Sequence, residues 1–315
     1  MPCPGIDRHT HLEGSLDPAW VRRRALEEGL TPPRALEALW RNEAVPFEGF
    51  IRAFFFSSGF LRDAGAVASA IRAAVGRLPP ALPGQPRGID LWVSPHFLVK
   101  LGHFLTLDAL WRGIDEGILE ARGQDVQIAV IVDAVNHFGP EHGHAVLDLV
   151  LPDQPAWITG FSTGGLEGVP FKAWAPVFDR ARKAGLKVAA HAGENGPAAN
   201  VREAVLDGGV ARIVHGVRAA GHPDMLELLA ERNIPVDVCI TSNRALVPEL
   251  GVHPLPAMLR AGVRCALGTD DPGVIPCTLP GEWEQAKGLG LAPAELEALR
   301  AHAQADAWCV QAKDA

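Results

Sequence analysis

Short apolar runs rich in β-branched residues alternate with longer segments of helical pattern along almost the whole chain, and this alternation constrains the fold most. Runs of this kind predict strands, and eight are present, at residues 5–11, 89–94, 126–133, 157–162, 186–191, 211–215, 234–240 and 263–269. Helices are expected between them, at residues 111–122, 145–150, 171–184, 201–206, 225–232 and 256–260. Eight strands that alternate with helices are the number that a (β/α)₈ TIM barrel requires.

The alternative α/β arrangement is an open doubly wound sheet, which usually carries a G-x-G-x-x-G turn after its first strand. Here the first strand runs into His-Thr-His-Leu-Glu-Gly at residues 9–14, so we favour a barrel in a single domain over residues 1–315. Residues 18–76 are mostly helical and too long for one crossover. We expect extra helices over the barrel mouth, with an apolar side that we interpret as core, made of Phe47, Phe50, Phe54, Phe55, Phe56 and Phe60.

Composition restricts the class of protein. A net charge of −8 argues against a nucleic-acid or membrane partner, since both favour basic surfaces. Five scattered cysteines without a C-x-x-C pair fit a reducing cytosol. No signal peptide and no long apolar span is visible, so we expect a cytoplasmic enzyme; its oligomeric state is not indicated. Tyrosine is absent, so a general acid or base must be His, Asp, Glu, Lys or Cys.

Imidazoles and carboxylates gather where the predicted strands end, namely at His9, His11, His191, His215, Asp270 and Asp271. His9 and His11 are two residues apart and therefore project to the same side of a strand. In a (β/α)₈ barrel the carboxyl ends of all strands meet at one face. Neutral imidazoles and a carboxylate suit Zn²⁺ with an open position for water. A histidine outside the metal shell can orient this water or take its proton, and a glutamate can serve as the acid. The sequence thus predicts a metal-dependent hydrolase.

Six segments resemble the sequence blocks of the adenosine deaminase family, in the metal-dependent amidohydrolase superfamily. They begin at His9, Ser162, His191, Arg212, Val238 and Gly268 and read HTHLEGSL, STGGLE, HAGE, RIVHGVR, VCITSN and GTDDP. The blocks occur in the family's order and cover nearly the whole chain. Departures exist as well: Trp92 stands where the family commonly has an arginine of the second strand, and residues 133–135 lack the arginine usual in the third. The chain is therefore identified as a divergent member.

The resemblance implies one zinc ion per chain, bound by His9, His11, His191 and Asp270. His215 would orient and deprotonate the attacking water, and Glu194 would donate a proton to purine N1, which requires a pKa raised by burial. Among the residues that bind the purine, Asp271 would contact N7, the Gly165 backbone N–H would face N3, and Glu13 would reach the sugar side. Strand 157–162 has no lysine to bridge a second metal, which favours a single ion.

The expected reaction is hydrolysis of the 6-amino group of a purine to a 6-oxopurine and ammonia. Three substrates share this chemistry: adenosine or deoxyadenosine, free adenine, and a 5′-substituted adenosine such as aminodeoxyfutalosine. We prefer a nucleoside, because the Gly164-Gly165 turn resembles the nucleoside-processing branch. A non-catalytic purine-binding barrel is a second hypothesis. A hydrolase of amide or phosphoester bonds is a third, and it would not require Glu194.

Other features have plainer interpretations. His142 and His144 repeat the H-x-H spacing, but they follow Gly139-Pro140 and indicate a helix start. Three further histidines stand beside Pro or Gly and are expected at the surface, namely His137, His222 and His253. Cys239 and Cys265 fall within predicted strands and are expected in the core. Arg8 alternates away from the metal-binding histidines, so we expect it to face solvent or to form a structural ion pair.

Overall fold

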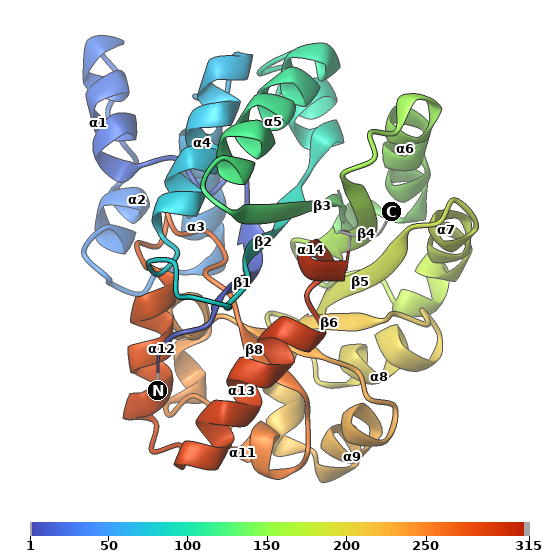
Figure 1. The fold of residues 1–315 in the computed structure, drawn as a ribbon. Helices are drawn as coiled ribbons and strands as arrows, with labels where there is room; N and C mark the ends of the chain where they lie inside the picture. Colours follow the sequence, from blue (N-terminus) through green and yellow to red (C-terminus); the bar gives the residue numbers. More distant parts are fainter. Residues whose placement is uncertain (1, 312–315) are drawn as a thin grey trace.

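The computed structural model describes residues 2–311, and its centre is a barrel of eight parallel strands in sequential order (Figure 1). The strands are β1 (Gly5–His11), β2 (Arg87–Val93), β3 (Val126–Val135), β4 (Ile158–Gly164), β5 (Lys187–Ala192), β6 (Arg212–His215), β7 (Val236–Val238) and β8 (Cys265–Leu267). The first strand meets the segment just after β8 at a bridge between Thr10 and Asp270. There the His11 N–H donates to the Asp270 carbonyl at 2.7 Å, and the Asp270 N–H donates to the His9 carbonyl at 2.8 Å. The predicted (β/α)₈ barrel is confirmed.

Helices surround the strands at the positions that the sequence predicts. The connecting helices are α5 (Leu107–Arg122), α6 (Pro140–Val150), α7 (Phe171–Lys183), α8 (Ala199–Leu206), α9 (Pro223–Glu231) and α11 (Leu255–Arg260). Several begin earlier than predicted. The Thr106 side chain caps α5, and a proline is the first residue of α6 and of α9. The hydrophobic pattern alone does not indicate these polar and proline starts.

The two final strands are shorter than predicted, and the chain after β8 is more helical. Residue 240 was expected in a strand, but α10 (Ile240–Leu246) begins there. The Glu282 carboxylate accepts the backbone N–H groups of Ile240 and Thr241, at distances from 2.7 to 3.3 Å, and so satisfies the first turn of α10. Three helices that we did not predict end the described chain: α12 (Leu279–Gly288), α13 (Pro293–Ala305) and α14 (Trp308–Gln311).

The segment after β1 forms four helices, as expected for an insertion: α1 (Pro18–Glu27), α2 (Arg34–Leu39), α3 (Phe47–Ser58) and α4 (Ala64–Gly76). α4 packs against α5 on the outside of the barrel (Figure 1). Gly113 and Gly117 of α5 permit this close approach, since a Cβ on either would lie 2.5–2.7 Å from atoms of α4. α2 and α3 instead enclose a small apolar cluster with residues that follow β8, such as Val274 and Ile275.

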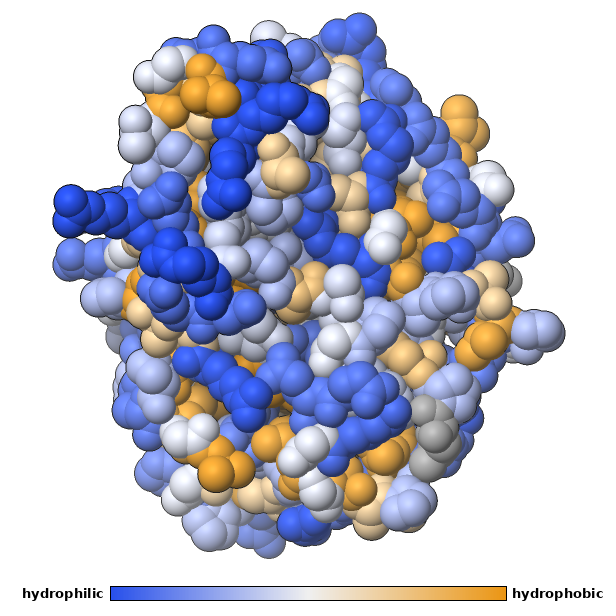
Figure 2. Space-filling model, turned by 90° about the vertical axis from the view of Figure 1, so that its left-hand side faces the viewer, coloured by the Kyte–Doolittle hydropathy of each residue, from blue (hydrophilic) through white to orange (hydrophobic). Residues whose placement is uncertain are grey.

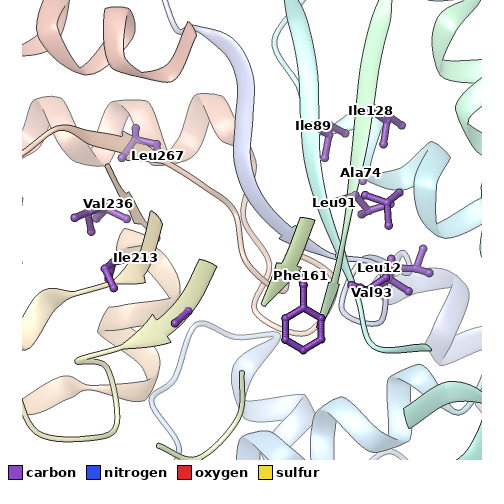
Figure 3. Packing of buried hydrophobic residues seen from close by; sticks show 14 of the residues in the cluster. Leu12, Ala74, Ile89, Leu91, Val93, Ile128, Phe161, Ile213, Val236 and Leu267 are labelled. Atoms are coloured by element: carbon purple, nitrogen blue, oxygen red, sulfur yellow. The ribbon is translucent and has the colours of Figure 1, made fainter. Parts of the chain in front are cut away.

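Two apolar layers hold the barrel together. The outer layer lies between strands and helices, and Figure 3 shows Ile89, Leu91 and Ile128 of neighbouring strands pointing toward Ala74 of α4. The inner layer fills the barrel itself and includes Ile6, Trp92, Ala129, Ile131, Ala189, Val214 and Trp308. Because Trp308 belongs to α14, the final helix contributes to the interior. Gly160 makes room for it, as a Cβ there would lie 2.2 Å from the indole.

Four buried charges form what we call the floor cluster, composed of Arg8, Asp90, Arg212 and Asp237. Arg8 lies 2.8 Å from Asp237, Arg212 lies 2.8 Å from Asp90, and none of the four side chains is exposed. The structural ion pair expected for Arg8 is therefore present, and the solvent-facing alternative is wrong. Asp90 also accepts the backbone N–H groups of Trp308 and Cys309 at 3.0 and 2.7 Å, which ties α14 to the cluster.

On the face that carries the extra helices, hydrophilic residues predominate and hydrophobic ones are scattered (Figure 2). Among residues 2–311, no helix combines the length and the apolar character needed to cross a membrane.

Candidate active site

The carboxyl ends of the strands open into a cavity of about 530 Å³. Residues from far apart in the chain line it, and they include His11, Gly165, His191, Glu194, His215, Asp270 and Asp271. A larger cavity of about 690 Å³ lies beside α2 and α12 and contains none of these residues. The strand-end side chains that we singled out from the sequence thus meet at one site.

His9, His11, His191 and Asp270 present their ligand atoms to one another at the bottom of this cavity. The Asp270 Oδ1 atom lies 3.2 Å from His9 Nε2 and 3.5 Å from His11 Nε2. The Nε2 atoms of His11 and His191 are 3.3 Å apart. All four side chains are almost completely buried, with exposed fractions no larger than 11%.

The protonation of this group fits a divalent metal ion. Burial lowers the pKa of His9 and of His11 to about 3 and that of His191 well below its usual value, so all three rings are neutral at pH 7. The His191 Nδ1 atom is 2.8 Å from the Thr163 carbonyl and must carry the hydrogen. Its Nε2 is then a bare lone pair aimed at His11. Lone pairs that converge with a carboxylate are the donor set of a zinc site.

Asp270 and His215 occupy strained backbone positions. Their φ angles are +62° and +64°, in the left-handed region that residues other than glycine rarely adopt. The strand bridge to Thr10 holds Asp270 in place. One residue earlier, the Asp7 carboxylate accepts the backbone N–H of Thr269 at 3.1 Å and its hydroxyl at 2.6 Å. The hydrogen bonds between β1 and the end of β8 thus direct the Asp270 side chain into the cavity.

Glu194 is held by a turn built on a second carboxylate. Glu167 accepts the backbone N–H groups of Gly193 and Glu194, both at 2.8 Å, and of Asn195 and Gly196, both at 3.1 Å. This places Glu194 Oε1 at 3.5 Å from His215 Nε2, with no hydrogen-bond partner of its own. Burial raises the pKa of Glu194 to about 7. A carboxyl group in this setting keeps a proton near neutral pH and can donate it.

Two more carboxyl groups, those of Asp133 and Asp271, line the cavity, and a third, that of Glu13, is fully buried and is not among the lining residues. Burial raises the pKa of Glu13 to about 7 and those of Asp133 and Asp271 well above their usual value. Each keeps one buried oxygen without a partner. Gly14 is required beside Asp271, since a Cβ there would lie 1.9 Å from the carboxylate. Asp133 was not predicted; the available signal was a lone acidic residue at the end of an otherwise apolar strand.

Comparison with known proteins identifies the family. The adenosine deaminase family model matches residues 4–315. An adenine deaminase of Rhizobium leguminosarum bv. trifolii is 33% identical over 307 residues, which cover 93% of this chain and 91% of that protein. An adenine deaminase of Chelativorans sp. is 30% identical over 300 residues, 92% of this chain and 89% of that one. The chain belongs to the adenosine deaminase family.

Solved structures of similar fold agree with this membership. The crystal structure of adenine deaminase from Arthrobacter aurescens superposes with a TM-score of 0.85 at 25% identity, over 99% of this chain and 98% of that one. An amidohydrolase from Burkholderia ambifaria with bound zinc reaches 0.81 at 21% identity, over 97% and 86% of the two chains, and shares the fold. The protein is therefore a hydrolase that acts on C–N bonds, within a metal-dependent family of deaminases for adenine-related substrates.

Two predictions about side-chain environment need correction in this deaminase. Phe47, Phe54 and Phe55 are predicted to belong to the core, but they line the cavity and are not fully buried, with Phe55 48% exposed. Phe50 also lines the cavity, but it is buried in the core as predicted. An apolar helix side can face a binding cavity as well as a core, and the sequence pattern does not distinguish the two. Phe56 does pack on Phe60, with ring centroids 5.5 Å apart.

One histidine expected at the surface is buried instead. His137 is exposed, as predicted, and it also lines the cavity and accepts the Leu166 N–H at 3.2 Å, next to the Gly165 turn. His253 is 2% exposed and hydrogen-bonds to Asn243. His222 is exposed, as predicted. His142 and His144 lie in α6, and Cys239 and Cys265 are fully buried, also as predicted. Cys239 is in addition close enough to His215 and Asp270 to form a possible metal-binding trio.

Proposed function

We propose that this protein is a zinc-dependent adenine deaminase, which hydrolyses the 6-amino group of the free base to give the 6-oxopurine and ammonia. One observation carries the proposal: neutral imidazoles and the Asp270 carboxylate converge beside the buried carboxyl of Glu194 in a single cavity. Within this family, that combination supplies both a metal site and an acid for the purine ring.

His9, His11, His191 and Asp270 would hold one zinc ion. The bound ion would lower the pKa of its water toward about 7, which makes hydroxide accessible at neutral pH. The hydrogen bond from His9 and the neighbouring imidazoles hold the pKa of Asp270 well below its usual value against the opposing effect of burial, so this ligand is ionised. His215, 4.0 Å from the other Asp270 oxygen, would orient the attacking water.

Glu194 would act as the acid at purine N1. Attack at C6 pushes negative charge into the ring, and a proton at N1 neutralises it. This role requires a protonated carboxyl before attack. The burial that raises its pKa to about 7 meets the requirement, and the four N–H groups that bind Glu167 keep the side chain in one place.

The remaining contacts would orient the base. Asp271, with a raised pKa, would donate to N7 when protonated, and the Gly165 N–H at the turn after β4 would face N3. In a nucleoside, N9 carries the sugar, which Glu13 would contact; in the free base, N9 carries a hydrogen instead. The unpartnered Oε2 of Glu13 is an acceptor suited to that hydrogen.

Two observations favour the free base over the nucleoside that we preferred from the sequence. Curated relatives that match most of the chain at 30–33% identity are adenine deaminases. Five phenylalanines line the cavity, Phe47, Phe50, Phe54, Phe55 and Phe97, together with polar side chains such as Glu48, Arg52, Ser94 and His137. A flat base can pack against the aromatic rings and brings no sugar hydroxyls that need partners.

The test is ammonia release by the zinc-loaded protein from adenine, adenosine, deoxyadenosine and a 5′-substituted adenosine. We expect kcat/KM for adenine to exceed that for each nucleoside by about a hundredfold or more, because a site closed around N9–H rejects a substituent there. A preference for any nucleoside would overturn the free-base assignment. Bound zinc without turnover would favour the purine-binding barrel. Hydrolysis of amide or phosphoester probes, unaffected by Glu194→Gln, would favour the third hypothesis.

A further inference from the structure

A line of three hydrogen bonds leads from the protein interior to His215. The Leu255 backbone N–H donates to His253 Nδ1 at 3.2 Å. His253 Nε2 lies 3.2 Å from Asn243 Oδ1, and Asn243 Nδ2 lies 3.1 Å from His215 Nδ1. All three side chains are at most 2% exposed, and neither Asn243 nor His253 lines the cavity.

The direction of these bonds is determined at their inner end, because a backbone N–H can only donate. His253 Nδ1 must therefore be an acceptor, and the single hydrogen of this neutral ring sits on Nε2. That hydrogen points at Asn243, so the amide must present its oxygen there and its NH₂ group to His215. His215 Nδ1 is then an acceptor as well. Its own hydrogen is left on Nε2, the atom that faces Glu194 at 3.5 Å and Asp270 at 4.0 Å.

We propose that His253 is a positioning residue, which acts through Asn243 to hold the hydrogen of His215 on Nε2. His215 then meets the reacting oxygen as a hydrogen-bond donor. The role of this tautomer in catalysis rests on the proposed function. The tautomer of His215 itself follows from the hydrogen bonds alone. Of the two roles that the family resemblance assigns to His215, orientation of the water is the one that this tautomer allows in the resting enzyme.

The surroundings leave the three side chains little freedom. Asn243 lies in α10, whose first turn is held by the buried Glu282 carboxylate. His253 lies two residues before Leu255, the first residue of α11. The hydrogen bond that its Nδ1 atom accepts from the Leu255 N–H therefore fixes the ring to the backbone nearby. Water does not reach these atoms and cannot replace a lost partner. Without His253, the Asn243 amide is free to turn and offer its oxygen to His215, which moves the hydrogen to Nδ1.

The tautomer is measured directly by ¹⁵N NMR of the zinc-loaded protein labelled at histidine. His215→Gln identifies the His215 signals. We expect a pyridine-type shift for Nδ1 and a pyrrole-type shift for Nε2 in the wild type. In Asn243→Asp the carboxylate can only accept, so the pattern should reverse or become that of the charged ring. A pyrrole-type Nδ1 in the wild-type protein would overturn the proposal, whatever the enzyme's activity.

Measurements of kcat and KM for three variants test whether this tautomer matters for catalysis. His253→Phe replaces the imidazole by a flat aromatic ring without nitrogens, and kcat for adenine should fall about 10- to 100-fold with KM within about twofold. His253→Gln retains an N–H donor near the Nε2 position and should recover kcat to within about threefold of the wild type. Asn243→Asp should fall at least as far as His253→Phe. Zinc content should be one per chain in all of them.

The outcomes separate this inference from the proposed function. An inactive but zinc-loaded wild type would count against adenine deamination, while the NMR pattern would still decide the tautomer. Unchanged kcat in His253→Phe would contradict the positioning role. Equal losses in His253→Phe and His253→Gln, with an unaltered His215 tautomer, would indicate a packing role and would also contradict it. If His253→Phe does not fold, the wild-type spectrum and Asn243→Asp carry the test.

Discussion

The two ends of the barrel interior both contain buried charge, but they handle it in opposite ways. In the floor cluster, two arginines face two aspartates at contact distances of 2.8–3.7 Å, and Asp90 takes two further N–H bonds from α14. Both oxygens of Asp237 lack a hydrogen-bond partner, but they lie against Arg8 and Arg212. At the mouth, Glu13, Asp133, Glu194 and Asp271 each keep a buried oxygen without a hydrogen-bond partner. Within the described residues, none of these four forms an ion pair with Lys or Arg.

This contrast separates charges that serve folding from charges that serve chemistry. Opposite charges in a buried cluster offset part of one another's desolvation penalty, and removing one member leaves an uncompensated buried charge. Uncompensated carboxyl groups in the same low dielectric destabilise the folded state, and such groups concentrate at functional sites. Trp92 lies between the two regions, since its ring contacts His9 at 4.3 Å and the Arg212 guanidinium at 5.7 Å, measured to the ring centroid. One side chain thus borders both the proposed metal site and the structural charge cluster.

The strongest expected effect is loss of the metal site. Asp270→Asn keeps the side-chain shape but removes the anionic ligand, so zinc binding should weaken sharply and ammonia release should fall to the limit of detection. Metal analysis after dialysis and the adenine assay measure both effects. The matched floor substitution Asp90→Asn should leave zinc stoichiometry at one per chain in the folded fraction. Normal zinc content in Asp270→Asn would contradict the ligand assignment.

Glu194→Gln comes next, with an expected loss of about 10²- to 10⁴-fold in kcat and no loss of zinc. The pKa raised to about 7 also sets a pH limit. Below it the acid form predominates, and above it kcat/KM should fall about tenfold per pH unit because the proton donor is lost. Glu194→Gln should abolish this alkaline limb. An alkaline limb that persists unchanged in the variant would mean that another group is the acid.

How far these residues could be predicted depends on what positions them. The barrel topology alone brings His9, His191 and Asp270 together, since every strand ends at the same face. A strand pattern in the sequence was therefore enough to place them. His253 is different: its burial depends on Asn243, ten residues away on another element, and a histidine beside proline gives no sign of that contact. The same holds for α10, whose start depends on Glu282 of α12.

The aromatic residues of α3 illustrate a second limit. Their spacing predicts an apolar helix side, which the structure confirms, but hydrophobic periodicity carries no information on what that side meets. Phe50 is 7% exposed and Phe55 is 48% exposed, although both line the cavity. The single-domain assignment of residues 1–315 and the roles of the site residues stay predictions.

Stability offers the next comparison of the two ends. Arg212→Met leaves Asp90 and Asp237 without one of their two cations, and we expect the free energy of unfolding to fall by about 3–5 kcal/mol. Asp271→Asn at the mouth removes a carboxyl group that has no cation to lose, so stability should be unchanged or rise by about 1 kcal/mol while activity falls. Denaturant unfolding of both variants measures the difference. Equal destabilisation would remove the distinction between floor and mouth.

Glu167 offers a test of the distinction between floor and mouth, because this mouth carboxylate accepts hydrogen bonds from four backbone N–H groups and from the Asn200 amide. In Glu167→Gln the amide NH₂ group must face at least one of these donors, and we expect a loss of roughly 1–2 kcal/mol in unfolding free energy. Glu194 should then be held less firmly, with kcat about tenfold lower and zinc unchanged. Glu203→Gln is the matched control, since Glu203 accepts one N–H, from Phe171 at 3.2 Å, away from the cavity. Its kcat should equal that of the wild type. If Glu203→Gln lowers kcat as much as Glu167→Gln, the effect comes from general loosening of the fold rather than from the turn that carries the acid.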